Sequence, residues 1–186
     1  MKLLSYLSFI KEGVSRKALI ITGDGFQDDE LFRPKSSLES AGYLVTVVGI
    51  DTGVVSAYNS DKTIKIESEV SNLNPSDYDI LVIPGGKAPD KIRKDKSIIS
   101  FVKEFYQTGK KIAAICHGPQ LLVTADIIEG VRMTCYPDMK EELISSGANY
   151  VDKELVIDGQ FITSRNPNDL DVFCKEIINK IKKSNF

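Results

Sequence analysis

Short runs of apolar residues alternate along this chain with stretches of helical periodicity, and turn formers separate the two. Runs of this kind are typical of strands buried on both faces, because a strand covered on one face only alternates apolar and polar residues. We interpret as strands the residues 18–22, 45–48, 80–83 and 112–115. Their alternation with helices predicts an α/β fold with a mostly parallel central sheet covered by helices on both faces.

The remaining segments complete this pattern. Helices are expected over residues 28–41, 97–106, 120–125, 140–146 and 169–183, the first ending at Gly42 and the last capped by Asn168. Residues 54–66 predict short strands joined by turns, and residues 155–163 a hairpin that turns at Asp158 and Gly159.

Length and composition favour one globular domain. The chain has 186 residues, of which 42% are apolar and 27% charged, so it is long enough to bury a sizeable core. We expect a single domain over residues 17–186. The formal charge of −2 gives no general attraction to nucleic acid or to an acidic membrane surface, so neither is an expected partner.

Residues 1–16 stand apart as an N-terminal extension. Leu3, Leu7, Ile10 and Val14 recur at helical spacing, which indicates a short amphipathic helix that packs on the domain or on a neighbouring subunit. A signal peptide is the alternative. Charged residues follow the apolar run at once and no small-x-small cleavage site is present, so a cytoplasmic protein is expected.

The cysteines and the histidine limit the possible cofactors. Cys116, Cys135 and Cys174 are widely and irregularly spaced, which indicates neither a disulfide framework nor a zinc ribbon. With one histidine in the chain no metal-ligand set is apparent. The turn at residues 23–25 lacks the spacing of a dinucleotide-binding loop. We therefore expect no metal and no cofactor.

The most informative segment for function is residues 112–119, where an apolar run ends at Cys116 and is followed by His117, Gly118 and Pro119. A buried strand that stops at a small nucleophile and turns straight into a helix is the arrangement of a nucleophile elbow. The N–H groups of the helix start would favour a thiolate. The alternative is a cysteine that acts as a small buried hydrophobe, but His, Gly and Pro do not suit a buried strand.

Two further features fit a reactive Cys116. Any Cys–His chemistry must use His117, and a third, acidic group is expected to orient its ring. Gly85 and Gly86 follow the strand at residues 80–83, so their N–H groups and that of His117 are candidate oxyanion donors. A plain tight turn is the alternative for the two glycines.

Several spaced motifs together resemble the PfpI family of intracellular cysteine peptidases and amidases, in the superfamily that includes the Parkinson-associated deglycase. The motifs are Asp29-Glu30-Leu31 with Pro34, residues 81–89, residues 113–120, Val156-Ile157-Asp158-Gly159 and Thr163-Ser164-Arg165. The resemblance runs from about residue 17 to the C-terminus. It implies a flavodoxin-like sandwich of the class I glutamine amidotransferase type.

The resemblance also implies roles for individual residues. Cys116 is the nucleophile and His117 its partner, while Glu30 lies beside the thiol in the protonated state; a helix first-turn acid is the alternative for Glu30. The acid that orients His117 comes from a neighbouring subunit at Asp90, where the pattern more often has glutamate; a helix cap is the alternative. Tyr136 is a candidate substrate contact, with a core tyrosine as the alternative.

A triad completed across subunits would require self-association as a dimer, trimer or hexamer. The implied function is a cysteine-dependent hydrolase acting on a peptide or amide, on a glyoxal-derived adduct or on methylglyoxal. The alternative function is a stress-responsive redox sensor or chaperone-like protein that uses a reversibly oxidised Cys116. A glutamine amidotransferase would need a histidine far downstream of its cysteine, and none follows His117.

Overall fold

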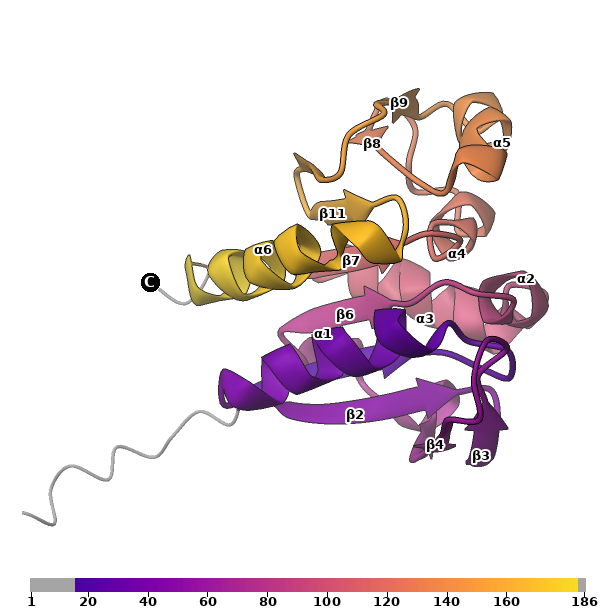
Figure 1. The fold of residues 1–186 in the computed structure, drawn as a ribbon, viewed down its shortest axis with the longest axis vertical. Helices are drawn as coiled ribbons and strands as arrows, with labels where there is room; N and C mark the ends of the chain where they lie inside the picture. The colour runs from indigo at the N-terminus through magenta and orange to yellow at the C-terminus, as the bar shows by residue number, and fades with distance from the viewer. Residues whose placement is uncertain (1–15, 184–186) are drawn as a thin grey trace, which may run out of the picture.

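A seven-stranded sheet forms the centre of the computed structural model, which describes residues 16–183 (Figure 1). The strand order is β10-β11-β7-β6-β1-β2-β5, and all neighbouring strands are parallel except β10 and β11. The strands are β1 (Lys17–Ile21), β2 (Leu44–Gly49), β5 (Ser68–Glu69), β6 (Ile80–Ile83), β7 (Lys111–Ile115), β10 (Val156–Asp158) and β11 (Phe161–Ser164). The expected mostly parallel sheet is confirmed.

The two faces of the sheet bury alternate residues of the same strands. In β6, Leu81 and Ile83 belong to one buried cluster, and Ile80 and Val82 belong to the other. Such alternation follows from the two-residue period of a strand. Because both sets are apolar, the strand requires a covering layer on each side, which produces three layers.

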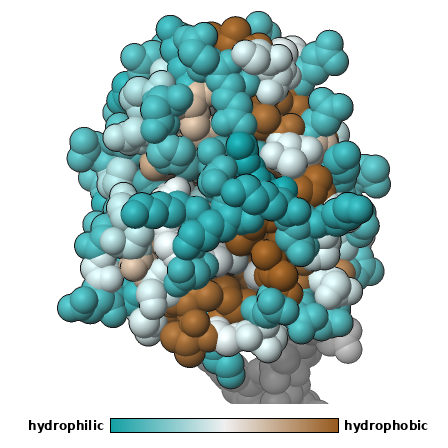
Figure 2. Space-filling model, turned by 90° about the vertical axis from the view of Figure 1, so that its right-hand side faces the viewer, coloured by the Kyte–Doolittle hydropathy of each residue, from teal (hydrophilic) through white to brown (hydrophobic). Residues whose placement is uncertain are grey.

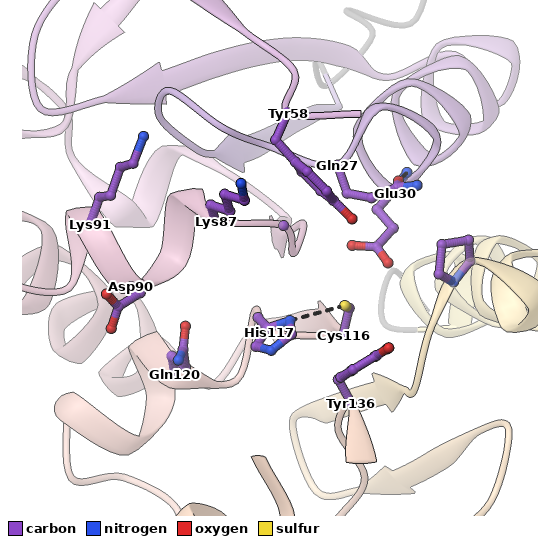
Figure 3. A pocket seen from close by; sticks show the side chains of 12 residues that line it. Gln27, Glu30, Tyr58, Lys87, Asp90, Lys91, Cys116, His117, Gln120 and Tyr136 are labelled. Atoms are coloured by element: carbon purple, nitrogen blue, oxygen red, sulfur yellow. Dashed lines mark hydrogen bonds between the residues drawn. The ribbon is translucent and has the colours of Figure 1, made fainter. Parts of the chain in front are cut away.

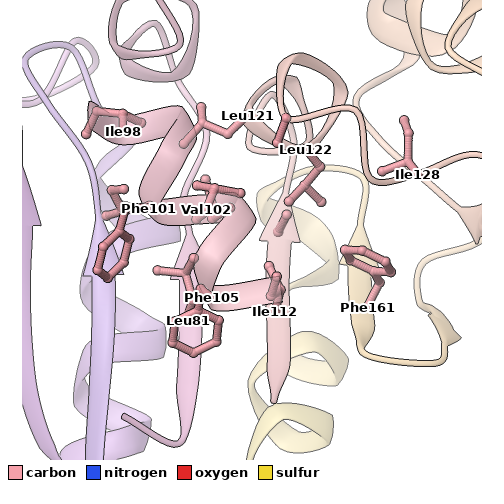
Figure 4. Close-up of a cluster of buried hydrophobic side chains, with 14 of the residues drawn as sticks. Leu81, Ile98, Phe101, Val102, Phe105, Ile112, Leu121, Leu122, Ile128 and Phe161 are labelled. Atoms are coloured by element: carbon pink, nitrogen blue, oxygen red, sulfur yellow. The ribbon is translucent and has the colours of Figure 1, made fainter. Parts of the chain in front are cut away.

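Helices supply these layers. α1 (Asp28–Ser40) and α6 (Leu170–Lys183) cover one face, while α3 (Lys96–Gln107) and α4 (Gln120–Thr124) cover the other. Figure 4 shows the cluster that contains Leu81, in which α3 places Phe101 and Phe105 against the strands. Asp95 starts α3 by accepting the N–H groups of Ser97 and Ile98.

Smaller elements lie around this core. They are the antiparallel hairpin of β3 (Gly53–Ser56) and β4 (Thr63–Ile66), the parallel pair of β8 (Arg132–Met133) and β9 (Asn149–Tyr150), α2 (Ala88–Ile92), α5 (Lys140–Ser145), and four 3-10 turns at Val70–Asn72, Pro75–Asp77, Pro137–Met139 and Pro167–Asp169. Figure 2 looks onto the end of the molecule at the right of Figure 1, where apolar side chains are exposed among hydrophilic ones.

The expected elements are present with small shifts at their ends. The two-residue strands β5, β8 and β9 and the four 3-10 turns were not expected, and two further details differ. The helix over Ala88–Ile92 was not expected, because five residues are too few to show a periodic pattern. Asn166 caps the final segment in place of Asn168, since a 3-10 turn precedes α6 and its first N–H donates to the Asn166 side chain. The expected N-terminal helix lies outside the described residues.

Candidate active site

A pocket of about 670 Å³ opens where the parallel strands end at their carboxyl termini, as is usual for ligand sites in open α/β sheets. Figure 3 shows the side chains around it. Glu30 comes from α1, Asp90 from α2, Cys116 and His117 from the turn after β7, and Tyr136 from the segment after β8. The fold thus gathers into one cavity residues that lie up to 140 positions apart, from Gln27 to Pro167.

Cys116 occupies a strained turn directly after β7. Its φ of 62° lies in the left-handed region, which is uncommon for a residue with a side chain. The Cys116 N–H still donates to Ser164 O of β11 (3.1 Å), and its carbonyl accepts the N–H of Tyr136 (2.9 Å). Hydrogen bonds on both sides therefore hold the strained backbone in place.

Gly118 makes this tight turn possible. A Cβ atom at position 118 would lie 2.3 Å from the carbonyl oxygen of Ile83 in the neighbouring strand β6. No other residue type fits without displacing the backbone. A strained Cys116 with an obligatory glycine two positions later, at Gly118, matches the nucleophile elbow that the sequence predicts.

The imidazole ring of His117 bends back toward the thiol of its neighbour. Its Nδ1 lies 3.3 Å from Cys116 Sγ, and its Nε2 lies 2.8 Å from Asp138 Oδ1. The ring of Tyr136 stacks on it, with the centroids 4.9 Å apart. Three neighbours thus set the position of the ring.

Glu30 is completely buried beside the thiol. Its N–H donates to the Gln27 side chain at the start of α1, and its Oε2 accepts the N–H of Gly85 at 2.8 Å. Burial raises the pKa of Glu30 from its usual 4.5 to about 7. Among the described residues, Oε1 has no hydrogen-bond partner, so a proton on Oε1 is available to a neighbouring acceptor.

Burial also raises the pKa of the Cys116 thiol, and a negative charge on Glu30 raises it further. The N–H groups of Gly86 and His117 point at the sulfur and act in the opposite direction. A protonated Glu30 carries no charge and can donate to the sulfur, so it removes one of the two causes that disfavour the thiolate. The geometry thus agrees with a protonated Glu30.

The predicted oxyanion donors differ in one respect from the observed arrangement. The N–H of Gly85 is occupied by Glu30, whereas those of Gly86 and His117 face the sulfur. Gly85 is needed for a different reason, because a Cβ there would lie 2.6 Å from Cys116 Cβ and 2.6 Å from Glu30 Oε2. The donor role assigned to Gly85 is therefore corrected to one of holding the Glu30 carboxyl against the thiol.

The model of the DJ-1/PfpI family matches residues 16–180, which is nearly all of the chain that the structure describes. This chain belongs to the DJ-1/PfpI family. Two relatives are similar over almost their full length. A deglycase of Pyrococcus abyssi is 36% identical over 89% of this chain and 99% of its own. YraA of Bacillus subtilis, whose name assigns it provisionally to the cysteine proteases, is 37% identical over 91% and 100%.

A solved structure supports the same fold. It is a two-domain protein of Anabaena variabilis with DJ-1/ThiJ/PfpI-like and ferritin-like domains, which superposes with a TM-score of 0.89 at 33% identity. The match covers 90% of this chain and 48% of that one, so this chain spans about half of the two-domain protein. The resemblance to the PfpI family and the flavodoxin-like sandwich are confirmed.

Within this DJ-1/PfpI chain, Asp90 lines the pocket but does not touch His117. It lies in the first turn of α2, whose N-cap is Lys87, so the alternative role of a helix cap is wrong. Its carboxylate pairs with Arg93 and Lys94, each at 3.3 Å. The triad role of Asp90, in which it orients His117 of a neighbouring subunit, stays a prediction.

Several residues at the site were not predicted from the sequence. Asp138 contacts His117, and Tyr58 and Gln120 line the pocket. Asp138 follows Tyr136 and Pro137 directly, so the search for an acid could have included it. Tyr58 follows the β3–β4 hairpin's first strand, and no local pattern links that segment to Cys116. Tyr136, in contrast, lies at the pocket as expected.

The described part of the chain offers no group of three or more metal-ligating side chains. None of the helices in residues 16–183 is long and apolar enough to cross a membrane.

Proposed function

We propose that this protein is a cysteine-dependent hydrolase in which the Cys116 thiolate attacks a carbonyl carbon. The observation that carries the proposal is the placement of Cys116 Sγ, which lies on a strained elbow at a pocket, 3.3 Å from an imidazole nitrogen. A nucleophile and a base within reach of each other are the signature of covalent catalysis. The names of the two relatives, a deglycase and a protease, support the same class of chemistry.

Each neighbour of Cys116 has a part in this scheme. His117 accepts the thiol proton and returns it to the leaving group. The N–H groups of Gly86 and His117 point at the sulfur, and in this scheme they stabilise the oxyanion that forms when the sulfur attacks the carbonyl carbon. Glu30 stays protonated and donates to the sulfur, so that it does not oppose the thiolate.

For the substrate we propose a glyoxal-derived adduct on a protein amine or free methylglyoxal, with a peptide or amide bond as the other candidate. All three reactions begin with thiolate attack on a carbonyl carbon and then use water to release the product. Tyr136 lies beside His117 at the pocket and is our candidate substrate contact. A small carbonyl compound needs little room beyond the immediate surroundings of Cys116.

Self-association and a location in the cytoplasm complete the proposal. The first derives from the resemblance and the second from the cysteines, whose spacing indicates no disulfide framework. If Asp90 of a neighbouring chain were required, activity would depend on the dimer or a higher oligomer. Light scattering of the purified protein checks this, and a monomer with full activity would refute it.

The test of the function compares wild-type protein with Cys116→Ser for consumption of methylglyoxal and formation of lactate. Cys174→Ser is the matched control, because Cys174 is a buried cysteine on α6 and does not line the pocket. We expect turnover in the wild type and the control and none in Cys116→Ser. Equal turnover in all three proteins would refute thiolate catalysis.

If wild-type protein leaves methylglyoxal unchanged, the same three proteins are assayed with peptide and amide substrates. Loss of hydrolysis in Cys116→Ser alone would assign the protein to the amide-cleaving branch. No turnover of any of these substrates would favour the redox alternative, for which mass spectrometry of Cys116 after peroxide treatment is the measurement.

A further inference from the structure

We propose that Asp138 of the same chain is the positioning residue for His117, so that the acid, the histidine and the cysteine all come from one subunit. The inference deepens the proposed function, on which it rests, by assigning the acid that the predicted triad takes from a neighbouring Asp90. It is carried by the contact of His117 Nε2 with Asp138 Oδ1 at 2.8 Å.

The two nitrogens of the His117 ring face different partners. Nδ1 lies 3.3 Å from Cys116 Sγ, and Nε2 faces the carboxylate of Asp138. A neutral imidazole has one N–H, and a carboxylate can only accept a hydrogen bond. Asp138 therefore favours the proton on Nε2 and leaves the lone pair of Nδ1 directed at the thiol. This is the tautomer that a general base at Cys116 needs.

The backbone that carries Asp138 is anchored to the elbow itself. The Tyr136 N–H donates to Cys116 O at 2.9 Å, and the Met139 N–H donates to Tyr136 O at 2.9 Å across a single 3-10 turn. The Met139 side chain is buried in the core. One end of the segment is thus tied to the nucleophile and the other to the core, which limits the positions that the Asp138 carboxylate can take.

The same segment also supplies the ring that packs on His117. Tyr136 stacks on the imidazole from one side, while Asp138 meets its edge. A stacked aromatic ring restricts rotation of the imidazole, and the carboxylate then selects which nitrogen faces the sulfur. Residues 136–138 therefore act together in positioning His117.

Asp138 of the same chain and Asp90 of a neighbouring chain are alternative candidates for the acid that orients His117. Nε2 carries the only N–H that the neutral ring can offer when Nδ1 accepts from the thiol, and Asp138 already occupies it. The Asp90 carboxylate meanwhile has its own partners in Arg93 and Lys94. A second carboxylate at the ring would add negative charge beside the thiolate without a proton to accept.

Solvent limits the size of the effect. The Asp138 side chain is 65% exposed, so its interaction with the ring is screened more than that of a buried pair. A charge-assisted hydrogen bond to a partly buried ring is nevertheless stronger than a hydrogen bond between two neutral groups. We expect the loss of the Asp138 charge to slow thiolate chemistry at Cys116 by about tenfold.

The first measurement is the alkylation rate of Cys116 by iodoacetamide at neutral pH, read from the mass of the peptide that contains Cys116. Asp138→Asn is expected to lower the rate about tenfold, and Asp138→Glu to restore part of it. Glu141→Gln is the matched control, because it removes the same charge from an exposed position in the neighbouring helix α5 and should leave the rate unchanged. Asp90→Asn is measured in parallel.

The second measurement is the tautomer of His117 in ¹⁵N spectra at a pH where the ring is neutral. The chain has one histidine, so its ring signals need no assignment. In the wild type we expect the proton on Nε2, and in Asp138→Asn a larger fraction on Nδ1. An Asp138 that merely stabilised the loop would not move this signal.

Unchanged rate and tautomer in Asp138→Asn would overturn the proposal. So would a loss of rate in Asp90→Asn with wild-type behaviour of Asp138→Asn, because the acid would then come from another subunit. Neither measurement uses a substrate. A wild-type protein without turnover would count against the proposed hydrolase, while the alkylation rate and the tautomer would still decide the role of Asp138.

Discussion

Replacing Glu30 by glutamine should change how the stability of the protein depends on pH. Glu30 is completely buried, and burial raises its pKa from 4.5 to about 7. In the unfolded chain this carboxyl ionises near its usual pKa, whereas in the folded protein it keeps its proton up to about pH 7. Between these values the folded state binds more protons, so the free energy of unfolding falls as the pH rises.

The pKa difference sets the size of this loss. A change from 4.5 to about 7 corresponds to about 3 kcal/mol at roughly 1.36 kcal/mol per pKa unit. The stabilising contribution is fully present below the unfolded pKa and is lost once the pH passes the folded pKa. Glutamine resembles the protonated carboxyl in shape, can still accept the N–H of Gly85 and does not ionise, so Glu30→Gln should not show this loss.

The assay is urea denaturation of wild type and Glu30→Gln at about pH 5 and about pH 8. We expect the wild type to lose about 2.5 kcal/mol more than the variant between these two conditions, because a small part of the full loss has already occurred at about pH 5, above the unfolded pKa of 4.5. Glu39→Gln is the matched control, since Glu39 lies exposed on the same helix and should leave the wild-type pH dependence intact. An equal pH dependence of wild type and Glu30→Gln would refute the reasoning and would mean that Glu30 ionises as in water.

Three other substitutions test the site and the fold. Gly85→Ala places a Cβ 2.6 Å from Cys116 Cβ, so we expect a destabilisation of about 1–3 kcal/mol and at least a tenfold slower alkylation of Cys116; a wild-type rate would contradict this. Phe105→Ala empties a buried position under α3 and should cost about 3–5 kcal/mol in urea denaturation, and a loss below about 1 kcal/mol would argue against its place in the core. Asp95→Ala removes the acceptor for two N–H groups at the start of α3 and should cost about 1 kcal/mol, whereas no loss in the same assay would show that water replaces the cap.

Most of the fold was predictable because the strand signal is local. The apolar runs of β1, β6 and β7 are buried on both faces, and only a sheet between two helical layers can cover such strands. α2 was not predictable in this way, since five residues show no periodicity. The cap of the final helix was missed because Asn166 and Asn168 are both good caps, and the choice between them depends on the 3-10 turn that precedes α6.

The part of the candidate site that consists of adjacent residues was predictable from the sequence. Cys116, His117 and Gly118 are adjacent, so the elbow follows from the strand that ends at residue 115. The environment of Glu30 could not be predicted in the same way, because residues far away in the sequence form it. Its raised pKa depends on complete burial and on the N–H of Gly85, which lies 55 positions away in the sequence.

The sequence by itself determined the elements, the mostly parallel sheet and the position of the reactive cysteine, because strand and turn preferences act over a few neighbouring residues. Only the tertiary structure decided which groups surround that cysteine. It assigned the Gly85 N–H to Glu30 and placed Asp138 on His117 Nε2. Hydrogen bonds of this kind depend on distances of about 3 Å between side chains and backbone far apart in the chain, and only the packing of the elements sets those distances.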